Sequence, residues 1–295
     1  MDQVSTLILA LSLIIIMLGM GLSLVADDFK RILIYPKSII FGLISQIVLL
    51  PIIGFAVASI FPMKTEIAIG IMILAACPGG PTSNLIAHMA KGDTALSVTL
   101  TALSSFIILL TIPFIINFAL NHFLAEGQLI KLNVVQTIIQ IFMIIIVPVS
   151  LGMLIRRFKK DFAIRMEKPV RKASGIVVAL VIIGIVIKEK DNILPNFQQA
   201  GIASLVLNVS SMMVGYYSSK LLGIAEKRAI SIAIETGIQN GTLAISIAVV
   251  LLHNTTFAIA PAVYSLLMFF TGGLAVYMGV KKDKATVQAQ LDTFF

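Results

Sequence analysis

The stretch from Arg228 to Leu252 constrains the fold more than any other part of the chain. Its sequence, RAISIAIETGIQNGTLAISIAVVLL, would rise about 37 Å as a helix, against about 30 Å of membrane hydrocarbon. The middle, from Glu235 to Thr242, carries one carboxylate, two amides, two hydroxyls and two glycines. A charged side chain at the bilayer centre costs about 2.5–3.5 kcal/mol, and unwound backbone is tolerated there only inside protein. We therefore predict a broken membrane-spanning helix at a binding site.

Composition assigns the whole chain to the membrane class. It is 58% hydrophobic and 12% charged, with a mean hydropathy of +1.03. The net charge of +8 does not indicate nucleic-acid binding, because the basic residues lie between apolar runs. The single cysteine, Cys77, excludes an intrachain disulfide. The N-terminal apolar run lacks a basic flank and is too long for a signal peptide, so we expect it to be retained as the first span.

Nine apolar segments are long enough to be membrane spans: 5–25, 38–61, 66–90, 94–121, 134–155, 173–188, 200–222, 228–252 and 258–280. With the N-terminus outside, eighteen Lys and Arg residues, including Lys30 and Arg31, fall on the cytoplasmic side. Four fall outside: Lys64, Lys131, Lys188 and Lys190. This asymmetry predicts a multi-pass protein with the N-terminus outside and the C-terminus cytoplasmic, and we expect it in a cell membrane, the bacterial inner membrane or a plasma membrane. We interpret the charged stretch 156–172 as a connection that determines topology; a lipid-headgroup patch is the alternative.

A second interruption lies in the third span, within CPGGPTSN at 77–84. Two prolines remove two N–H donors and two glycines between them free the backbone, so the helix should stop and restart. Pro81 suits the first turn of the new half-helix, and Thr82, Ser83 and Asn84 supply oxygen atoms directly after it. A simple kink requires one proline. The pattern therefore predicts a functional break.

The two interrupted spans, the third and the eighth, are five helices apart. An odd offset reverses orientation, so the chain is predicted to contain an inverted repeat with two crossing, broken helices. Gln46 in span two and Asn208 in span seven then occupy comparable places. Half-helix N-termini at the crossing would offer N–H groups and positive dipole ends to an anion. The fold class is thus an all-α polytopic membrane protein.

At these residues the chain resembles the bile acid:sodium symporter family. The resemblance covers nearly the whole chain and rests on four motifs: GMGLSL, CPGGPTSN, the hydroxyl stripe ALSVTLT and IETGIQNGTLA. It implies a nine-helix transporter that operates by alternating access and is not an enzyme. It also implies a core domain, from 38–121 and 200–280, and a panel domain, from 5–25 and 134–188. The expected partners are a small organic anion, sodium and the lipid bilayer, with no other cofactor, and a monomer is expected.

The resemblance implies two sodium sites behind the crossing. One would use Ser83, Asn84, Ser97, Thr101 and Glu235; the other would use Gln46, Glu235 and Gln239 with carbonyl groups of Thr236 and Ile238. Oxygen ligands of this kind suit a hard cation, and two sodium ions sharing one carboxylate nearly balance its charge. Thr82 and Asn240 would face the substrate. Pro81, Gly241, Asn208 and Thr271 complete the candidates for substrate binding.

Departures from the family pattern bear on the substrate. Pro81 stands where the family has a hydroxyl, and Met268-Phe269 stands where some members that bind bile acids have His-Asn. Both changes favour an organic anion smaller than a bile acid, such as a pantoate-like or keto acid.

Two other functions need to be weighed. A proton-coupled exchanger of the same fold would use Glu235 as its titrating group. An intramembrane enzyme is disfavoured, because His88, His122 and His253 are scattered without metal-ligand spacing and no nucleophile–base arrangement is present.

Overall fold

The computed structural model describes residues 3–25, 27, 33–124, 134–188 and 193–292. These residues form helices and no β-strand, in agreement with the predicted all-α class. The elements are α1 (Gln3–Ser23), α3 (Pro36–Ile44), η2 (Ser45–Leu49), α4 (Leu50–Ile60), α5 (Thr65–Ala75), α6 (Pro81–Met89), α7 (Thr94–Phe123), α8 (Val134–Ile141), η3 (Phe142–Ile146), α9 (Val147–Phe158), α10 (Lys160–Lys188), α11 (Ile193–Leu221), α12 (Glu226–Gly237), α13 (Gly241–Ser246), η5 (Ile247–Leu251), η6 (Thr256–Ala258) and α14 (Ile259–Asp292).

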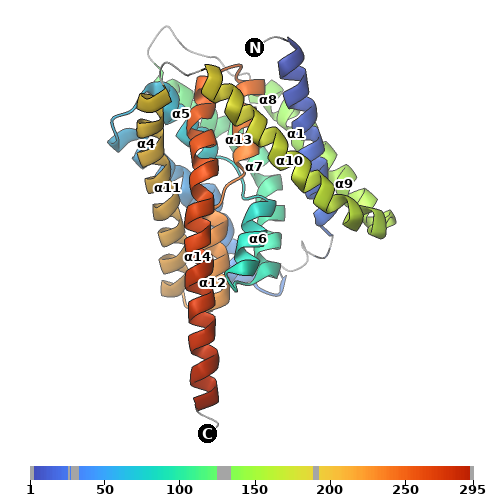
Figure 1. Ribbon diagram of the computed structural model, residues 1–295, viewed down its shortest axis with the longest axis vertical. Coiled ribbons are helices and arrows are strands. Elements are labelled where there is room, and N and C mark those ends of the chain that lie inside the picture. Colours follow the sequence, from blue (N-terminus) through green and yellow to red (C-terminus); the bar gives the residue numbers. More distant parts are fainter. Residues whose placement is uncertain (1–2, 26, 28–32, 125–133, 189–192, 293–295) are drawn as a thin grey trace.

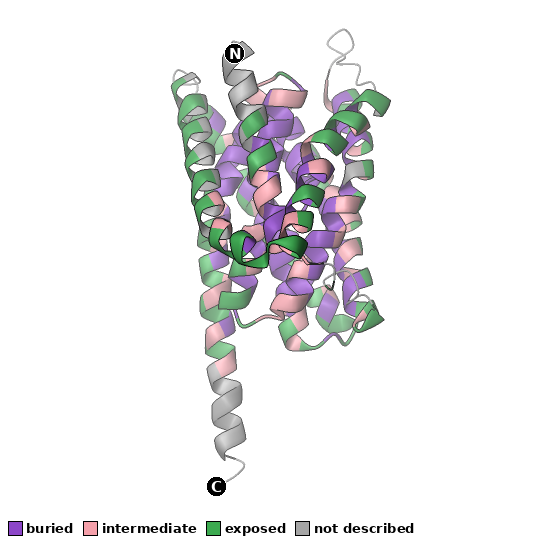
Figure 2. Cartoon of the chain, turned by 90° about the vertical axis from the view of Figure 1, so that its right-hand side faces the viewer, coloured by how far each residue is buried: buried purple, intermediate pink, exposed green. Residues whose placement is uncertain are grey.

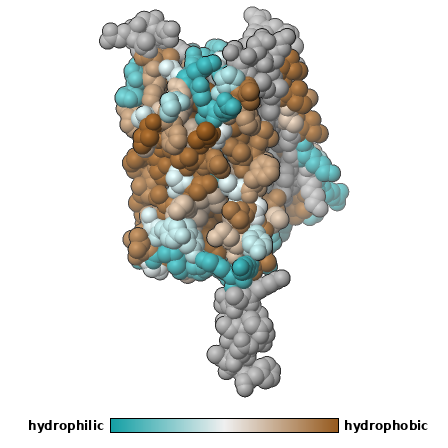
Figure 3. All heavy atoms as spheres, turned by 60° about the vertical axis from the view of Figure 1, so that its left-hand side comes forward, coloured by the Kyte–Doolittle hydropathy of each residue, from teal (hydrophilic) through white to brown (hydrophobic). Residues whose placement is uncertain are grey.

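Four helical stretches in the described residues are long and apolar enough to cross a membrane: 36–60, 135–158, 194–221 and 256–283. Helix α7 makes a fifth if its two parts, bent by 62°, count as one span. Pro113 lies inside α7 and explains the bend, since its ring crowds the carbonyl group four residues earlier. Residues that face the interior are buried, and the outer helix faces are exposed (Figure 2). Many of the exposed residues are large and apolar. Apolar residues cover its middle, with hydrophilic residues toward both ends (Figure 3).

Both predicted interruptions are present, and they meet. Helix α5 ends at Ala75 and α6 begins at Pro81, while α12 ends at Gly237 and α13 begins at Gly241. The two breaks form one antiparallel bridge, between Gly79 and Gln239, and the Asn240 N–H donates to the Pro78 carbonyl at 2.9 Å. In Figure 1, α5 and α13 lie in the upper half and α6 and α12 in the lower half, so the chain crosses itself near the middle. Each break therefore satisfies backbone groups of the other that its own helix cannot pair.

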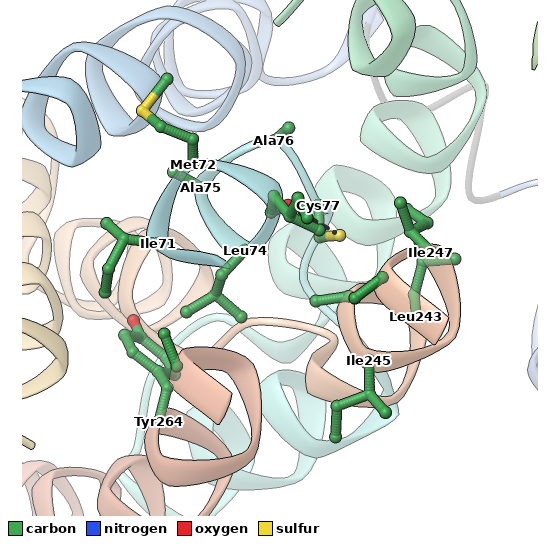
Figure 4. Packing of buried hydrophobic residues seen from close by; sticks show 14 of the residues in the cluster. Ile71, Met72, Leu74, Ala75, Ala76, Cys77, Leu243, Ile245, Ile247 and Tyr264 are labelled. Carbon is green, nitrogen blue, oxygen red and sulfur yellow. Dashed lines mark hydrogen bonds between the residues drawn. The ribbon is translucent and has the colours of Figure 1, made fainter. Parts of the chain in front are cut away.

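Helix α5 is deeply buried, since every residue from Ile67 to Ala75 is shielded from solvent. A helix that is apolar on all sides belongs in a core. Figure 4 shows Cys77, two residues after the end of α5, on the side of Leu243 of α13 and Ile247 of η5, while Leu74 of α5 points toward Tyr264; all belong to one buried cluster. Apolar packing therefore surrounds the chain where it enters the first break.

Two long helices contain a π-helical turn just before a proline. Turn η2 precedes Pro51 and η3 precedes Pro148. Proline has no N–H and crowds the preceding turn, so a wider turn accommodates it. Turn η2 carries Gln46, which is buried at the crossing.

Two sets of helices pack closely within themselves. Helices α1, α9 and α10 pack together on the right in Figure 1, and α11 packs against α4, α12 and α14. Helices α1 and α9 approach closely at two glycines: a Cβ atom on Gly21 would lie 2.1 Å from the Val149 carbonyl oxygen, and one on Gly152 would lie 2.3 Å from that of Leu18. Small residues allow helix backbones to approach in this way.

Polar contacts join the last turns of α11, the first turn of α12 and Lys282 within α14. Glu226 accepts hydrogen bonds from Tyr216 at 2.7 Å and Lys282 at 3.0 Å, and forms an ion pair with Lys220 at 3.0 Å. Burial alone would raise the pKa of Glu226, but the hydrogen bonds from Tyr216, Lys282 and Lys220 outweigh it and lower the pKa to about 2.

The charged stretch 156–172 differs from its prediction. It is helical except at Lys159, because α9 continues to Phe158 and α10 begins at Lys160. Charged side chains do not prevent a helix; they only set where it leaves the hydrocarbon. Four residues used to predict orientation, Lys30, Arg31, Lys131 and Lys190, lie outside the described residues.

We predict that Gly152→Ala destabilises the protein, because the new methyl group meets backbone of α1 that cannot turn aside. Overpacking of this kind costs about 1–3 kcal/mol, so the melting temperature in detergent should fall by several degrees. Gly201→Ala is the matched control, since a Cβ atom there has no neighbour within 4 Å. Equal melting temperatures for Gly152→Ala and wild type would contradict the close approach.

We also predict a loss of stability in acid that depends on Glu226. Its pKa in the folded protein, about 2, is below its ordinary value of 4.5. The ionised form is therefore favoured by folding, and its contribution is complete above pH 4.5 and declines as the pH falls toward 2. Melting temperatures measured across this window should fall less steeply for Glu226→Gln than for wild type. Parallel curves would show that the contacts of Glu226 do not stabilise the fold.

Candidate functional site

The carboxylate of Glu235 lies at the centre of the crossing. It belongs to the last turn of α12, and the residue is 1% exposed. Its Oε2 accepts hydrogen bonds from Ser83 at 2.8 Å and Ser97 at 3.2 Å, and its Oε1 accepts one from Thr101 at 2.5 Å. Helix α6 supplies Ser83, and α7 supplies Ser97 and Thr101 one turn apart.

Asn84 completes this first cluster. Its Oδ1 accepts from Ser97 at 2.8 Å and from Thr101 at 3.1 Å. The structure therefore brings together all five residues that the sequence assigned to the first site.

The cluster contains more acceptor oxygens than protons. The hydroxyl groups of Ser83, Ser97 and Thr101 approach acceptors in seven hydrogen-bond contacts, but three hydroxyls carry three protons. Among the residues that the structure describes, no ion pair involves Glu235. A buried carboxylate without a cationic partner is costly, and a hard cation would satisfy the surplus oxygens. This donor set fits an alkali metal ion.

Gly79 makes room for the carboxylate. A Cβ atom at this position would lie 2.2 Å from Oε1 of Glu235 and 3.1 Å from Oγ of Ser83. Any other residue would displace the acid, so the first break contributes space as well as backbone freedom.

A second polar cluster adjoins the first. Gln46 Nε2 donates to the Cys77 carbonyl and to Gln239 Oε1, each at 2.8 Å. Gln239 Nε2 donates to the carbonyl groups of Thr236 at 2.7 Å and Glu235 at 3.1 Å, and lies 3.4 Å from Gln46 Oε1. Three oxygens thus converge on one amide nitrogen. Ile238 is buried beside them, and its N–H donates to the Ile234 carbonyl at 2.7 Å.

A cavity of about 600 Å³ lies in front of the crossing. Its polar floor comes from the two breaks and includes Pro81, Thr82, Asn240 and Gly241, four of the six predicted substrate candidates. Its apolar walls come from α1, α10 and α14 and include Met268 and Phe269. No lysine, arginine or histidine is among the described residues that line it.

Backbone N–H groups supply positive charge to this floor. The Ser83 N–H donates to the Gly80 carbonyl, and the Asn240 side chain accepts from the Leu243 N–H at 3.1 Å. The N–H groups of Thr82 and Thr242 remain at the starts of α6 and α13, and both residues line the cavity. The floor is suited to a carboxylate.

The remaining two substrate candidates lie elsewhere. Asn208 is fully buried between α11, α12 and α14, where it bonds to Gly237 and Tyr264. The hydroxyl group of Thr271 donates back to the Met268 carbonyl, one turn earlier on the same helix. Neither lines the cavity. Both residues were predicted to bind substrate because they are polar within an apolar span. Polar side chains in apolar helices often form hydrogen bonds to backbone groups instead of facing a cavity.

Sequence reasoning missed several residues of the cavity. Ser265 was not marked, although it lies against Gly241, where a Cβ atom would clash with its hydroxyl group. Thr242 has a detectable signal, since it follows the second break as Thr82 follows the first. The apolar walls, from Met17 and Met20 of α1 to Ile183 of α10, carry no signal that separates them from lipid-facing positions.

Comparison with known proteins gives consistent matches. The chain is 29% identical over 274 residues to an uncharacterized sodium-dependent transporter, YocS, of Bacillus subtilis, covering 92% of this chain and 82% of that protein. It is 29% identical over 279 residues to a probable sodium/metabolite cotransporter, BASS1, from chloroplasts of Arabidopsis thaliana, covering 94% and 67%. It is 25% identical over 301 residues to the human ileal sodium/bile acid cotransporter, covering 99% and 84%.

The sequence pattern of the Sodium Bile acid symporter family matches residues 10–196, more than half of the chain. That range includes α5, α6 and α7, which carry Ser83, Asn84, Ser97 and Thr101. The relatives extend the similarity through the second break. The chain belongs to the sodium bile acid symporter family, a family of transporters rather than enzymes.

Proposed function

We propose that this protein is a sodium-coupled symporter that takes up an organic anion by alternating access. The observation that carries this proposal is the buried, acceptor-rich cluster around Glu235, directly behind a cavity floored by the two helix breaks. A cation in the cluster and an anion in the cavity would compensate each other's charge. The names of the relatives support sodium as the cation.

The first sodium site consists of Ser83, Asn84, Ser97, Thr101 and Glu235. Their oxygens already lie within hydrogen-bonding distance of one another, so little movement is needed to surround an ion. Sodium would replace the competing hydrogen bonds with direct contacts to lone pairs.

The second sodium site consists of Gln46, Glu235 and Gln239 with the carbonyl groups of Thr236 and Ile238. The Gln239 amide nitrogen occupies the point where oxygens of Gln46, Glu235 and Thr236 converge. If that amide turns over, its oxygen faces this point and sodium can replace the N–H donors. We propose this exchange as the local step that accompanies binding of the second ion.

The substrate is a small organic anion, in keeping with the expected pantoate-like or keto acid. The floor offers N–H groups and hydroxyls of Thr82 and Thr242 together with Asn240, and the walls are apolar. Such a lining suits a carboxylate attached to an apolar body. Met268 and Phe269 on the wall add no hydrogen-bond donor, consistent with a ligand smaller than a bile acid.

We propose nine membrane crossings arranged as an inverted repeat, with the third and eighth broken. The core domain comprises 38–121 and 200–280, and the panel domain comprises 5–25 and 134–188. The cavity lies between them, since its lining comes from α1 and α10 on one side and from α6, α14 and both breaks on the other. Rocking of one domain against the other would alternate access.

We place the N-terminus outside and the C-terminus in the cytoplasm of a bacterial cell, and on that orientation we propose that this arrangement is an inward-facing state. The cavity is lined by Met20 and Ser23 near the end of α1 and by the half-helix α6, all on the cytoplasmic side in this orientation. On the other side, Leu13, Ile144 and Ile145 meet Leu243 and Ile247 around a space of only about 20 Å³. This apolar contact would seal the outside.

Proton coupling through Glu235 is the alternative, and cation replacement at constant pH distinguishes the two. We expect sodium chloride, but not potassium chloride, to raise the melting temperature of the purified protein. We also expect a sodium gradient to drive uptake of a labelled bile acid, pantoate or branched keto acid into proteoliposomes. Equal melting temperatures in both salts, with uptake driven by a pH gradient alone, would favour the exchanger.

We predict that Glu235→Ala abolishes the sodium-dependent shift while the protein still inserts, because the site loses its only carboxylate. Thr101→Val should raise the sodium concentration for half-maximal effect roughly tenfold, since it removes one oxygen ligand (about 1.4 kcal/mol). Ser104→Ala on the same helix is the control, because its hydroxyl donates only to the Thr101 carbonyl. A sodium response retained by Glu235→Ala would exclude the proposed role.

We predict that Gln46→Leu lowers the Hill coefficient for sodium from above one toward one. The substitution removes a ligand of the second site and leaves the five residues of the first site intact. Sodium titration of uptake or of the melting temperature measures the coefficient. A wild-type coefficient of one, or no change in the variant, would argue against two coupled sodium ions.

A further inference from the structure

The carbonyl group of Gly237, the last residue of α12, is held by two side chains that the proposed mechanism does not use. Asn208 Nδ2 donates to it at 2.7 Å from α11, and the hydroxyl group of Tyr264 donates to it at 2.5 Å from α14. The same Asn208 nitrogen also donates to the Tyr264 hydroxyl at 3.1 Å. Asn208 and Tyr264 are both fully buried. Three helices therefore meet at one carbonyl oxygen.

A helix end inside a membrane protein makes such contacts necessary. The last carbonyls of an α-helix have no partner within the helix, and an unpaired one at this depth costs several kcal/mol. Here Gln239 satisfies the carbonyl groups of Glu235 and Thr236, while Asn208 and Tyr264 satisfy that of Gly237. Each carbonyl in the last three residues of α12 thus accepts from a side chain, with Glu235 and Thr236 sharing the Gln239 amide nitrogen.

Gly237 also brings α12 close enough to α11 for this contact. A Cβ atom at Gly237 would lie 2.0 Å from Cγ of Met212, one turn after Asn208 on α11. The absence of a side chain at Gly237 and the short side chain of Asn208 together fix the distance between the two helices. The end of α12 can therefore neither slide nor turn without breaking these contacts.

We propose that Asn208 and Tyr264 are positioning residues for sodium, acting through the Gly237 carbonyl. The inference rests on the proposed function, because its consequence concerns the second sodium site. The carbonyl of Thr236 and the side chain of Glu235 lie one and two residues before Gly237 in the same helical turn. Holding Gly237 holds these ligands in the geometry that the ion needs.

The first break contains a similar contact between a side-chain amide and a backbone carbonyl group. Gln46 Nε2 donates to the Cys77 carbonyl at 2.8 Å, just after the end of α5. In both halves of the chain, an amide on the preceding long span holds the carbonyl that follows or ends the first half-helix. The two amides differ in their other contacts. Gln46 also contacts Gln239 at the ion site, whereas Asn208 Oδ1 has no hydrogen-bond partner in the described part of the chain. We infer that the first amide both ligates and positions, and that Asn208 only positions.

The test uses Tyr264→Phe and Asn208→Asp in the full-length protein, with sodium as the probe. Tyr264→Phe keeps the ring and removes one donor to Gly237, and Asn208→Asp keeps the size and removes the other when ionised. Each should raise the sodium concentration for half-maximal thermal stabilisation roughly five- to tenfold, a free-energy change of about 1.0–1.4 kcal/mol. Tyr277→Phe, an exposed position on the same helix, should leave that concentration unchanged.

A second readout separates positioning from general stability. Melting temperatures in potassium chloride report the fold without sodium. If the variants melt lower in potassium but reach half-maximal sodium effect at the wild-type concentration, the residues are merely structural and the inference is overturned. If Asn208→Asp does not fold, Tyr264→Phe alone decides. Failure of the proposed function looks different, because the wild-type protein itself would then show no sodium effect.

Discussion

The structure depends on the burial of one carboxylate. Glu235 lies in the middle of the protein, 1% exposed, with three hydroxyl donors and no ion-pair partner among the described residues. An ionised carboxylate in such a place is stable only when it is hydrogen-bonded and its charge is compensated. The hydroxyls of α6 and α7 supply the hydrogen bonds. In the proposed mechanism, the coupling ions supply the charge.

The two helix breaks are one structural unit rather than two independent defects. Each leaves carbonyl and N–H groups that its own helix cannot pair. The bridge between Gly79 and Gln239 and the bond from Asn240 to Pro78 pair the breaks with each other. Gly79 also leaves the space that the Glu235 carboxylate fills. Substitution at either break therefore affects the polar cluster around Glu235 and the cavity floor together.

The arrangement also explains how ion binding can be linked to the cavity. Asn240 caps the second half-helix and lines the cavity, while Gln239, its neighbour, joins the amide cluster behind the crossing. A change in the Gln239 amide is thus one residue away from the substrate floor. Binding of sodium and anion would be coupled through this short segment, and such coupling is reciprocal in free energy.

The sequence by itself determined the all-α membrane class, the two breaks and the choice of Glu235 as the central acid. These features are local: prolines, glycines and a charge inside apolar runs are visible without knowing any neighbour. The five residues of the first cluster were also identified, through their resemblance to family motifs. Only the tertiary structure decided that Asn208 donates a hydrogen bond to the Gly237 carbonyl instead of facing the cavity. It also decided that α1 and α10 form cavity walls. The physical reason is that lipid-facing and protein-facing sides of a membrane helix are both apolar, so hydropathy does not reveal which side meets which partner.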